Sequence, residues 1–150
     1  MKTNYVFTNT LSKQFYLLVL LSSFLISSCT VQYVAQYDET VKNEIIRIAG
    51  EVDKFFIEQL EMTENERTYL YAKEKYLMIE VDLNSLLTKN EIRALNNQSI
   101  KQNELALKLW LDDKEQHKKK DKVSDAIINS HRSQFKRIFI AMAKGEEVKN

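Results

Sequence analysis

The side chains best suited to chemistry in this 150-residue chain are two histidines, several acidic pairs and one cysteine. His117 and His131 are 14 positions apart on separate expected helices, so their spacing does not predict a shared metal site. Ser130 and Ser133 are close to His131 in sequence, but neighbours along a helix point in different directions and give no evidence for a nucleophile with its base. The chain has no His-Glu-x-x-His motif and no glycine-rich phosphate loop. We therefore expect a protein that is not an enzyme and uses no metal or cofactor.

Two acidic pairs, Glu80 with Asp82 and Asp112 with Asp113, occupy positions that we expect to be exposed. Catalysis by paired carboxylates requires two groups that converge in a cleft. Their spacing in the sequence does not predict such a cleft, so we assign them no catalytic role.

Cys29 is the only cysteine, which excludes an intramolecular disulfide and a structural zinc site built on cysteines. It closes an N-terminal stretch with Lys2, Lys13 and a run of twelve mostly apolar residues at 15–26. A run of this length is short for a hydrocarbon core of about 30 Å, which takes about 20 residues, and is typical of a secretory signal.

Ile26, Ser27 and Ser28 stand directly before Cys29. An aliphatic residue, two small residues and a cysteine in this order resemble the lipobox of bacterial lipoproteins. The resemblance implies that residues 1–28 are a signal peptide that is removed, and that Cys29 carries a diacylglycerol on its thiol and, in Gram-negative cells, an acyl chain such as palmitate on its amine. Two alternatives stay open: an ordinary signal peptide followed by an uninvolved cysteine, and an uncleaved N-terminal anchor.

The residue after the cysteine bears on localisation. In sorting of the enterobacterial type, an aspartate at this position retains a lipoprotein in the inner membrane. Thr30 occupies the position here. The resemblance therefore implies a lipid anchor in the outer membrane, with the domain facing the periplasm, if the host is Gram-negative.

The charge balance argues against one class of partner. The chain has 22 basic and 21 acidic residues, and residues 1–28 contain two lysines and no acidic residue, which leaves 20 against 21, or −1, in the remainder. A protein that binds nucleic acid needs a basic face, so we expect no nucleic-acid partner. The absence of proline and the presence of only two glycines favour helices over an all-β fold.

Residues 29–37 are expected to form the lipidated cysteine and a short tether. Val31, Tyr33, Ala35 and Tyr37 alternate with mostly polar residues, which predicts a short strand or an extended arm. Eight extended residues reach at most about 29 Å, so we expect the domain close to the membrane. Tyr33 and Tyr37 then lie at the headgroup level or pack on the domain, and both alternatives stay open.

Apolar residues at alternating steps of three and four predict a helical domain over residues 38–144 and a polar tail at 145–150. The expected helices cover about 38–61, 64–87, 100–118 and 124–144. Whether the second helix continues through 91–96 stays open. The predicted boundaries depend on Asp38 as an N-cap, capping boxes at Thr63–Glu66 and Ser99–Gln102, and Gly145 as a C-cap.

Each expected helix has an apolar stripe that predicts its core face. The stripes are Val41, Ile45, Ile48, Val52 and Phe55; Tyr69, Tyr76, Ile79, Leu83 and Leu86; Ile100, Leu107, Trp110 and Leu111; and Ile127, Phe135, Ile138 and Met142. We expect an all-α fold of about four helices, either an antiparallel bundle or an elongated helical hairpin that completes its core as a homodimer. Trp110 is expected to be a core or interface anchor.

Lys118, Lys119 and Lys120 lie in a strongly charged stretch at 112–122. They are either a solvated helix end or a contact for anionic lipid or glycan phosphate. Together with Tyr33 and Tyr37 they are the candidate residues for contact with a membrane or a partner.

Three segments carry a second resemblance: Val34-Ala35-Gln36-Tyr37-Asp38, Val52-Asp53-Lys54-Phe55-Phe56, and Tyr76 with Val81-Asp82-Leu83. They resemble a group of small, functionally uncharacterised bacterial lipoproteins, and the resemblance implies no activity. We expect Asp53 and Asp82 to cap helices or to pair with lysine or arginine across helices.

These observations predict a lipid-anchored protein of the cell envelope that binds or scaffolds an envelope protein through its helix faces. The alternative is a carrier of a small ligand or lipid, with a cavity among the helices rich in tyrosine and methionine.

Overall fold

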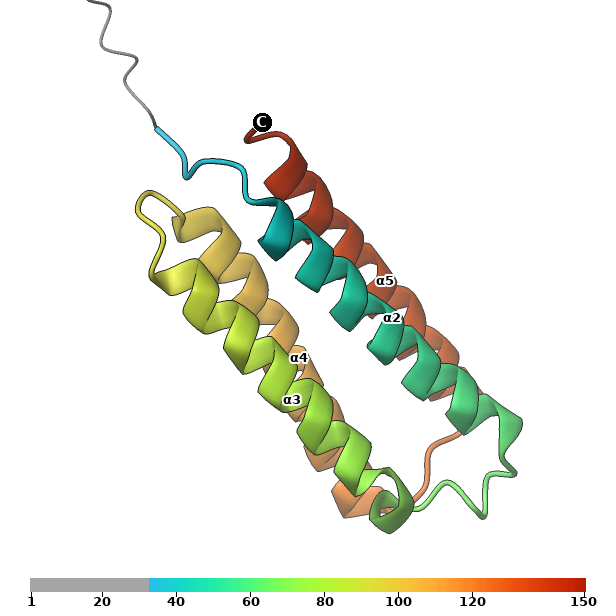
Figure 1. The fold of residues 1–150 in the computed structure, drawn as a ribbon. Helices are drawn as coiled ribbons and strands as arrows, with labels where there is room; N and C mark the ends of the chain where they lie inside the picture. Colours follow the sequence, from blue (N-terminus) through green and yellow to red (C-terminus); the bar gives the residue numbers. More distant parts are fainter. Residues whose placement is uncertain (1–32) are drawn as a thin grey trace, which may run out of the picture. The chain divides into compact units, whose positions relative to one another are not determined.

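The computed structural model describes residues 33–150, and the expected signal peptide and Cys29 lie outside the described residues. Four α-helices of 23 or 24 residues follow one another: α2 (Glu39–Glu61), α3 (Tyr69–Glu91), α4 (Asn97–Lys120) and α5 (Asp125–Glu147). Helix α2 packs against α3 and α5, and α4 packs against the same two helices, in an antiparallel bundle (Figure 1). The prediction of an all-α fold with four helices is confirmed.

The start of α2 follows the sequence prediction. The Asp38 side chain accepts hydrogen bonds from the backbone N–H groups of Thr40 (2.9 Å) and Val41 (3.2 Å), which satisfies donors that the first turn of a helix leaves unpaired. All five residues of the predicted stripe from Val41 to Phe55 are buried. The alternating spacing therefore identified the core face of this helix correctly.

Helix α3 begins later than predicted. The Thr63 N–H and hydroxyl both donate to Glu66 (2.9 and 2.7 Å), but these hydrogen bonds close a turn and do not start the helix. Arg67 then directs its side chain into the bundle, where it donates to two backbone carbonyl groups. Thr68 is the N-cap instead, and the helix starts at Tyr69.

The connection between α3 and α4 also departs from the prediction. Helix α3 continues through residues 88–90, where a break was expected, and ends at Glu91. Leu95 in the following turn has a φ of 59°, in the left-handed region, which costs a residue with a β-carbon about 1–2 kcal/mol. Helix α4 then starts at Asn97 and has no capping box at Ser99, whose hydroxyl accepts a hydrogen bond from Lys149 (2.8 Å).

Three side chains of α4, spaced seven residues apart, fix its register against α3 and the segment just before α3. Each is buried and donates to a backbone carbonyl group: Asn103 to Leu83 (3.0 Å), Trp110 to Tyr76 (3.0 Å) and His117 to Arg67 (2.9 Å). A buried donor that loses its acceptor costs about 1–3 kcal/mol, so sliding one helix along the other would break all three at once.

The core face of α4 therefore differs from the predicted one. Trp110 is fully buried, whereas Ile100, Leu107 and Leu111 are only half-buried. Asp113, which we expected at an exposed position, is buried as well. The prediction counted apolar residues alone, and polar side chains that form hydrogen bonds inside the bundle occupy the central face.

Trp110 is the centre of an aromatic cluster. Its ring centroid lies 5.0 Å from Tyr76, 5.3 Å from Phe55 and 5.6 Å from Phe135, within the range in which aromatic pairs attract one another. These three residues belong to α3, α2 and α5, so one side chain contacts all the other helices. The prediction of a core anchor is confirmed.

The segment before α2 is an extended arm that packs on the bundle. The Ala35 N–H donates to the Leu95 carbonyl (3.1 Å), and Arg93 donates to the carbonyl of the next arm residue. Ala35 is buried, Tyr37 is half-buried and Tyr33 is 82% exposed. The predicted arm is thus confirmed from Ala35 onward, while Tyr33 projects into solvent.

Helix α5 ends three residues later than predicted. Gly145 lies inside the helix, whose last residue is Glu147, so the predicted C-cap and the boundary at 144 are wrong. The continued helix places Glu146 in the interior with 1% of its surface exposed. Its carboxylate accepts hydrogen bonds from the Asp38 N–H (2.9 Å) and from Arg93 (2.6 and 3.2 Å).

Lys149 donates to the same carboxylate at 2.6 Å. Burial by itself would raise the pKa of Glu146, but the hydrogen bonds from Arg93 and Lys149 outweigh that effect and hold the pKa below its ordinary value. The ionised Glu146 carboxylate therefore joins the arm, the α3–α4 turn and the end of α5.

We expect Glu146→Ala to lower the free energy of unfolding by about 3–5 kcal/mol, because the largely buried Arg93 and Lys149 lose their counter-charge. Denaturant unfolding measures the change. The matched control is Glu147→Ala, which removes an ion pair to Lys42 from a mostly exposed carboxylate and should cost less than about 1 kcal/mol. Equal losses in the two variants would contradict the prediction.

Candidate functional site

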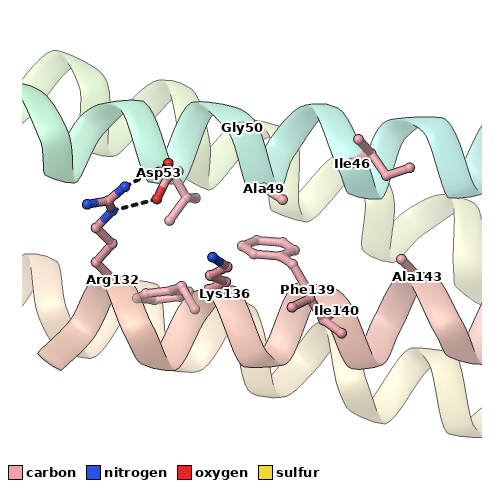
Figure 2. A pocket seen from close by; sticks show the side chains of 11 residues that line it. Ile46, Ala49, Gly50, Asp53, Arg132, Lys136, Phe139, Ile140 and Ala143 are labelled. Carbon is pink, nitrogen blue, oxygen red and sulfur yellow. Dashed lines mark hydrogen bonds and ion pairs between the residues drawn. The ribbon is translucent and has the colours of Figure 1, made fainter. Parts of the chain in front are cut away.

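A half-open groove follows the seam between α2 and α5 and encloses about 300 Å³ (Figure 2). Its lining is Ile46, Ala49, Gly50, Val52, Asp53, Arg132, Phe135, Lys136, Phe139, Ile140 and Ala143. Most of these residues are apolar, and the charged ones gather toward one end of the groove. The groove therefore offers an apolar surface with one charged end.

Small residues keep this groove open. Ala49 and Gly50 line it from α2, and Ala143 lines it from α5. A β-carbon added at Gly50 would meet no atom within 4 Å, so no packing contact inside the bundle requires a glycine there. A glycine in the middle of a helix costs about 1 kcal/mol of stability relative to alanine. The residue that leaves the groove open at position 50 therefore lowers the stability of the fold.

Two ion pairs join α2 and α5, and one of them, between Asp53 and Arg132, lines the groove. Arg132 holds Asp53 through two hydrogen bonds (2.6 and 3.2 Å), and Lys42 pairs with Glu147 at 3.1 Å. The groove lining on α2 runs from Ile46 to Asp53, seven positions that correspond to about 10 Å at 1.5 Å per residue. The Arg132 hydrogen bond also lowers the pKa of Asp53, and the predicted pairing of this carboxylate across helices is confirmed.

The opposite seam, between α2 and α3, has a different character. Three ion pairs cross it: Arg47 with Asp82 (2.9 Å), Lys75 with Glu58, and Lys89 with Glu44. The predicted pairing of Asp82 is thereby confirmed as well. A groove of about 240 Å³ on this side is lined mainly by charged residues, so the apolar groove on the α2–α5 side is the better candidate for a binding site.

His117 belongs to a polar cluster in the interior. Its Nε2 atom lies 2.9 Å from the Arg67 carbonyl, which can only accept, so Nε2 carries the proton. In the neutral ring Nδ1 then accepts from the Tyr76 hydroxyl at 3.2 Å. Burial raises the pKa of Tyr76, which keeps this hydroxyl protonated as a donor.

The fold also brings together Asp113 of α4 and His131 of α5, which their sequence spacing did not predict. His131 Nδ1 lies 2.7 Å from the Asp113 carboxylate. The void beside Asp113 and His117 measures about 10 Å³, which admits at most one water molecule and no substrate. Within residues 33–150 no group of three His, Cys, Asp or Glu side chains is arranged to hold a metal ion. The cluster has the properties of a structural network.

The candidate contact residues do not come together. Lys118, Lys119 and Lys120 are exposed at the C-terminal end of α4, at the opposite end of the bundle from the arm that carries Tyr33 (Figure 1). Helix α4 has 24 residues and spans about 36 Å. If one end of the bundle rests on a surface, only the three lysines or only Tyr33 can contact that surface.

In the part of the chain that the structure describes, no helix has both the length and the apolar composition needed to cross a membrane. Comparisons with protein-family models, with curated proteins and with solved structures found no match to this chain. The resemblances to the lipobox and to small bacterial lipoproteins therefore stay predictions.

The ion pair between Asp113 and His131 predicts a pH dependence of stability. The Asp113 hydrogen bond raises the pKa of His131 above its ordinary value of 6.5. Because the folded-state pKa is the higher one, the stabilisation by the charged imidazole is fully present below pH 6.5 and is lost as the pH rises through the folded-state pKa.

We therefore expect the stability difference between the unsubstituted protein and His131→Gln to be largest near pH 6 and to shrink toward about pH 9. Denaturant unfolding at a series of pH values measures it. Using the difference between two variants cancels the titration of all other groups. A difference that is constant with pH would show that the charged form of His131 does not stabilise the fold.

Proposed function

We propose that this chain is a lipid-anchored, non-enzymatic protein of the cell envelope that binds a helix of a partner protein in the α2–α5 groove. The observation that carries the proposal is the half-open apolar groove with the Asp53–Arg132 ion pair at one end. The lipobox-like sequence that ends at Cys29 supports the anchor, and Thr30 supports an outer-membrane location facing the periplasm in a Gram-negative host.

The dimensions of the groove favour a helix as its occupant. The lining extends about 10 Å along α2, which corresponds to roughly two helical turns. Ala49, Gly50 and Ala143 allow a second backbone to approach closely, while Ile46 and Ile140 are 53% and 46% exposed and offer apolar contacts. A partner helix would present apolar residues at positions i, i+3 or i+4, and i+7. Lys136 in the groove favours an acidic residue on the partner.

The lipid anchor is the second part of the proposed binding mechanism. Two or three acyl chains hold a protein stably on a membrane, since each buried methylene contributes about 0.8 kcal/mol. Confinement to the membrane raises the effective concentration of the groove for a partner in the same envelope layer, so that a modest contact suffices for binding.

The carrier alternative draws less support. The void inside the bundle is about 10 Å³, and Tyr71 and Met78 of the tyrosine- and methionine-rich helix are more than half exposed on its surface. The α2–α5 groove itself, at about 300 Å³, lies at the small end of pockets that hold small molecules.

We expect a photo-crosslinking amino acid at Ile46 or Ile140 to form an adduct with one envelope protein in living cells, because both side chains border the groove. The control position is Leu105, which is exposed to a similar extent (49%) on α4. Mass spectrometry should place the crosslink on a helical segment of the partner. An adduct with a second copy of this chain would identify a homodimer instead.

Gly50→Leu tests the groove directly. The position has open space for a side chain, so the variant should fold, fill the groove and abolish the adduct at Ile140. An adduct of equal yield in Gly50→Leu, or at Leu105, would contradict binding in the groove.

We expect the lipid anchor to depend on Cys29. The full chain should partition into the detergent phase and incorporate labelled palmitate in a bacterial host with lipoprotein-processing enzymes, and Cys29→Ser should lose the label. A Cys29→Ser protein that remains membrane-bound and palmitate-labelled would contradict the anchor.

A further inference from the structure

Exposed apolar side chains from three segments gather at one end of the bundle. The arm, the α3–α4 turn and the end of α5 all lie at this end (Figure 1). The exposed apolar residues are Tyr33 and Val34 in the arm, Ile92 and Leu95 in the turn, and Val148 after α5. We call these five residues the apolar tip.

Hydrogen bonds hold the three segments of the apolar tip together. The Ala35 N–H binds the Leu95 carbonyl at 3.1 Å, and Lys149 donates to the Asn96 side chain at 2.8 Å. The buried Glu146 carboxylate joins all three segments. The apolar tip is therefore a built surface and not a set of unrelated loop residues.

Leu95 gives a second, independent indication. Its φ of 59° suits glycine or asparagine, and its side chain is more than half exposed. A leucine at this position is strained and contributes little packing to the bundle. Strain that the fold does not require indicates that the side chain acts elsewhere.

We infer that the apolar tip rests in the interface of the lipid bilayer, so that the bundle stands on this end. The inference rests on the lipid anchor of the proposed function: Tyr33 is four positions after Cys29, which limits the distance between them to about 14 Å. Tyrosine rings favour the headgroup level, and small apolar side chains enter the acyl boundary beside it.

This orientation has consequences for the other surfaces. Lys118, Lys119 and Lys120 point away from the anchoring membrane, at the far end of α4. The α2–α5 groove begins beyond the Lys42–Glu147 pair and extends away from the membrane, where the helix of a periplasmic partner can reach it.

The test places one fluorescent label on the lipidated full chain in vesicles of phosphatidylethanolamine and phosphatidylglycerol. Because lipidation occupies the thiol of Cys29, a cysteine introduced by Ile92→Cys is the only free one. The matched control is Leu70→Cys at the start of α3, since Leu70 and Ile92 are 81% and 79% exposed. We expect the label at position 92 to shift its emission to the blue and to be quenched by lipids brominated near the headgroup, with no change at position 70.

The outcomes separate the inference from the proposed anchor. A parent protein that reacts with the label has an unmodified Cys29, which overturns the anchor and this inference with it. An unreactive parent with an unquenched label at position 92 overturns the inference alone. A blue shift that depends on protein concentration without quenching by brominated lipid would assign the apolar tip to a contact between copies of the chain and would also overturn it.

Leu95→Asn tests the argument from strain. The variant should unfold at the same or a higher temperature and should reduce the quenching of the label at position 92. The control Leu105→Asn, also an exposed leucine, should leave the quenching unchanged. A clear loss of thermal stability in Leu95→Asn would show that the leucine serves the fold, and would overturn its assignment to the membrane.

Discussion

One buried charge governs the organisation of this bundle. A carboxylate with 1% of its surface exposed, such as that of Glu146, is tolerated only when donors surround it, and Arg93, Lys149 and the Asp38 N–H provide them. These donors come from the α3–α4 turn, the C-terminal residues and the arm. The hydrogen bonds of the Glu146 carboxylate therefore fix the positions of all three segments at this end of the bundle. They require that α5 continues past Gly145 and that the arm packs on the bundle.

A second constraint acts along the axis of α4. Its central face carries Asn103, Ala106, Trp110, Asp113 and His117, at alternating steps of three and four, and all five are buried. The spacing is the same one that identified the core of α2, but polar residues occupy three of the five positions. A count of apolar residues therefore selected a neighbouring face. The polar side chains lie inside because they can reach carbonyl groups or a histidine on neighbouring segments, and this depends on how the helices pack.

The other elements were likewise predicted correctly where the signal is local, and incorrectly where it depends on packing between helices. Local signals such as the Asp38 N-cap and the core stripe of α2 were read correctly, since they depend on residues within one helix. The capping box at Thr63–Glu66 forms its hydrogen bonds but does not start a helix, because the next residue, Arg67, directs its side chain into the bundle. The groove had no sequence signal of its own, since its walls come from α2 and α5, which are more than 60 residues apart. Only the ion pair of Asp53 was anticipated, and its partner Arg132 was not.

Gly50 and Leu95 are two of the residues within 33–150 that local backbone preferences do not favour. Gly50 stands on the exposed face of α2 where alanine would fit, and Leu95 stands at a positive φ where glycine or asparagine would fit. Sequences generally agree with their fold at each local position and depart from it where function requires another residue. Gly50 has no side chain to fill the groove, and Leu95 adds apolar surface to the apolar tip. The two departures thus lie on the two surfaces that we propose for contact with a partner helix and a bilayer, whereas Glu146 and Trp110 find their hydrogen-bond partners inside the bundle. Both departures, at Gly50 and Leu95, thus agree with our proposal of a protein that acts through contacts at these two surfaces.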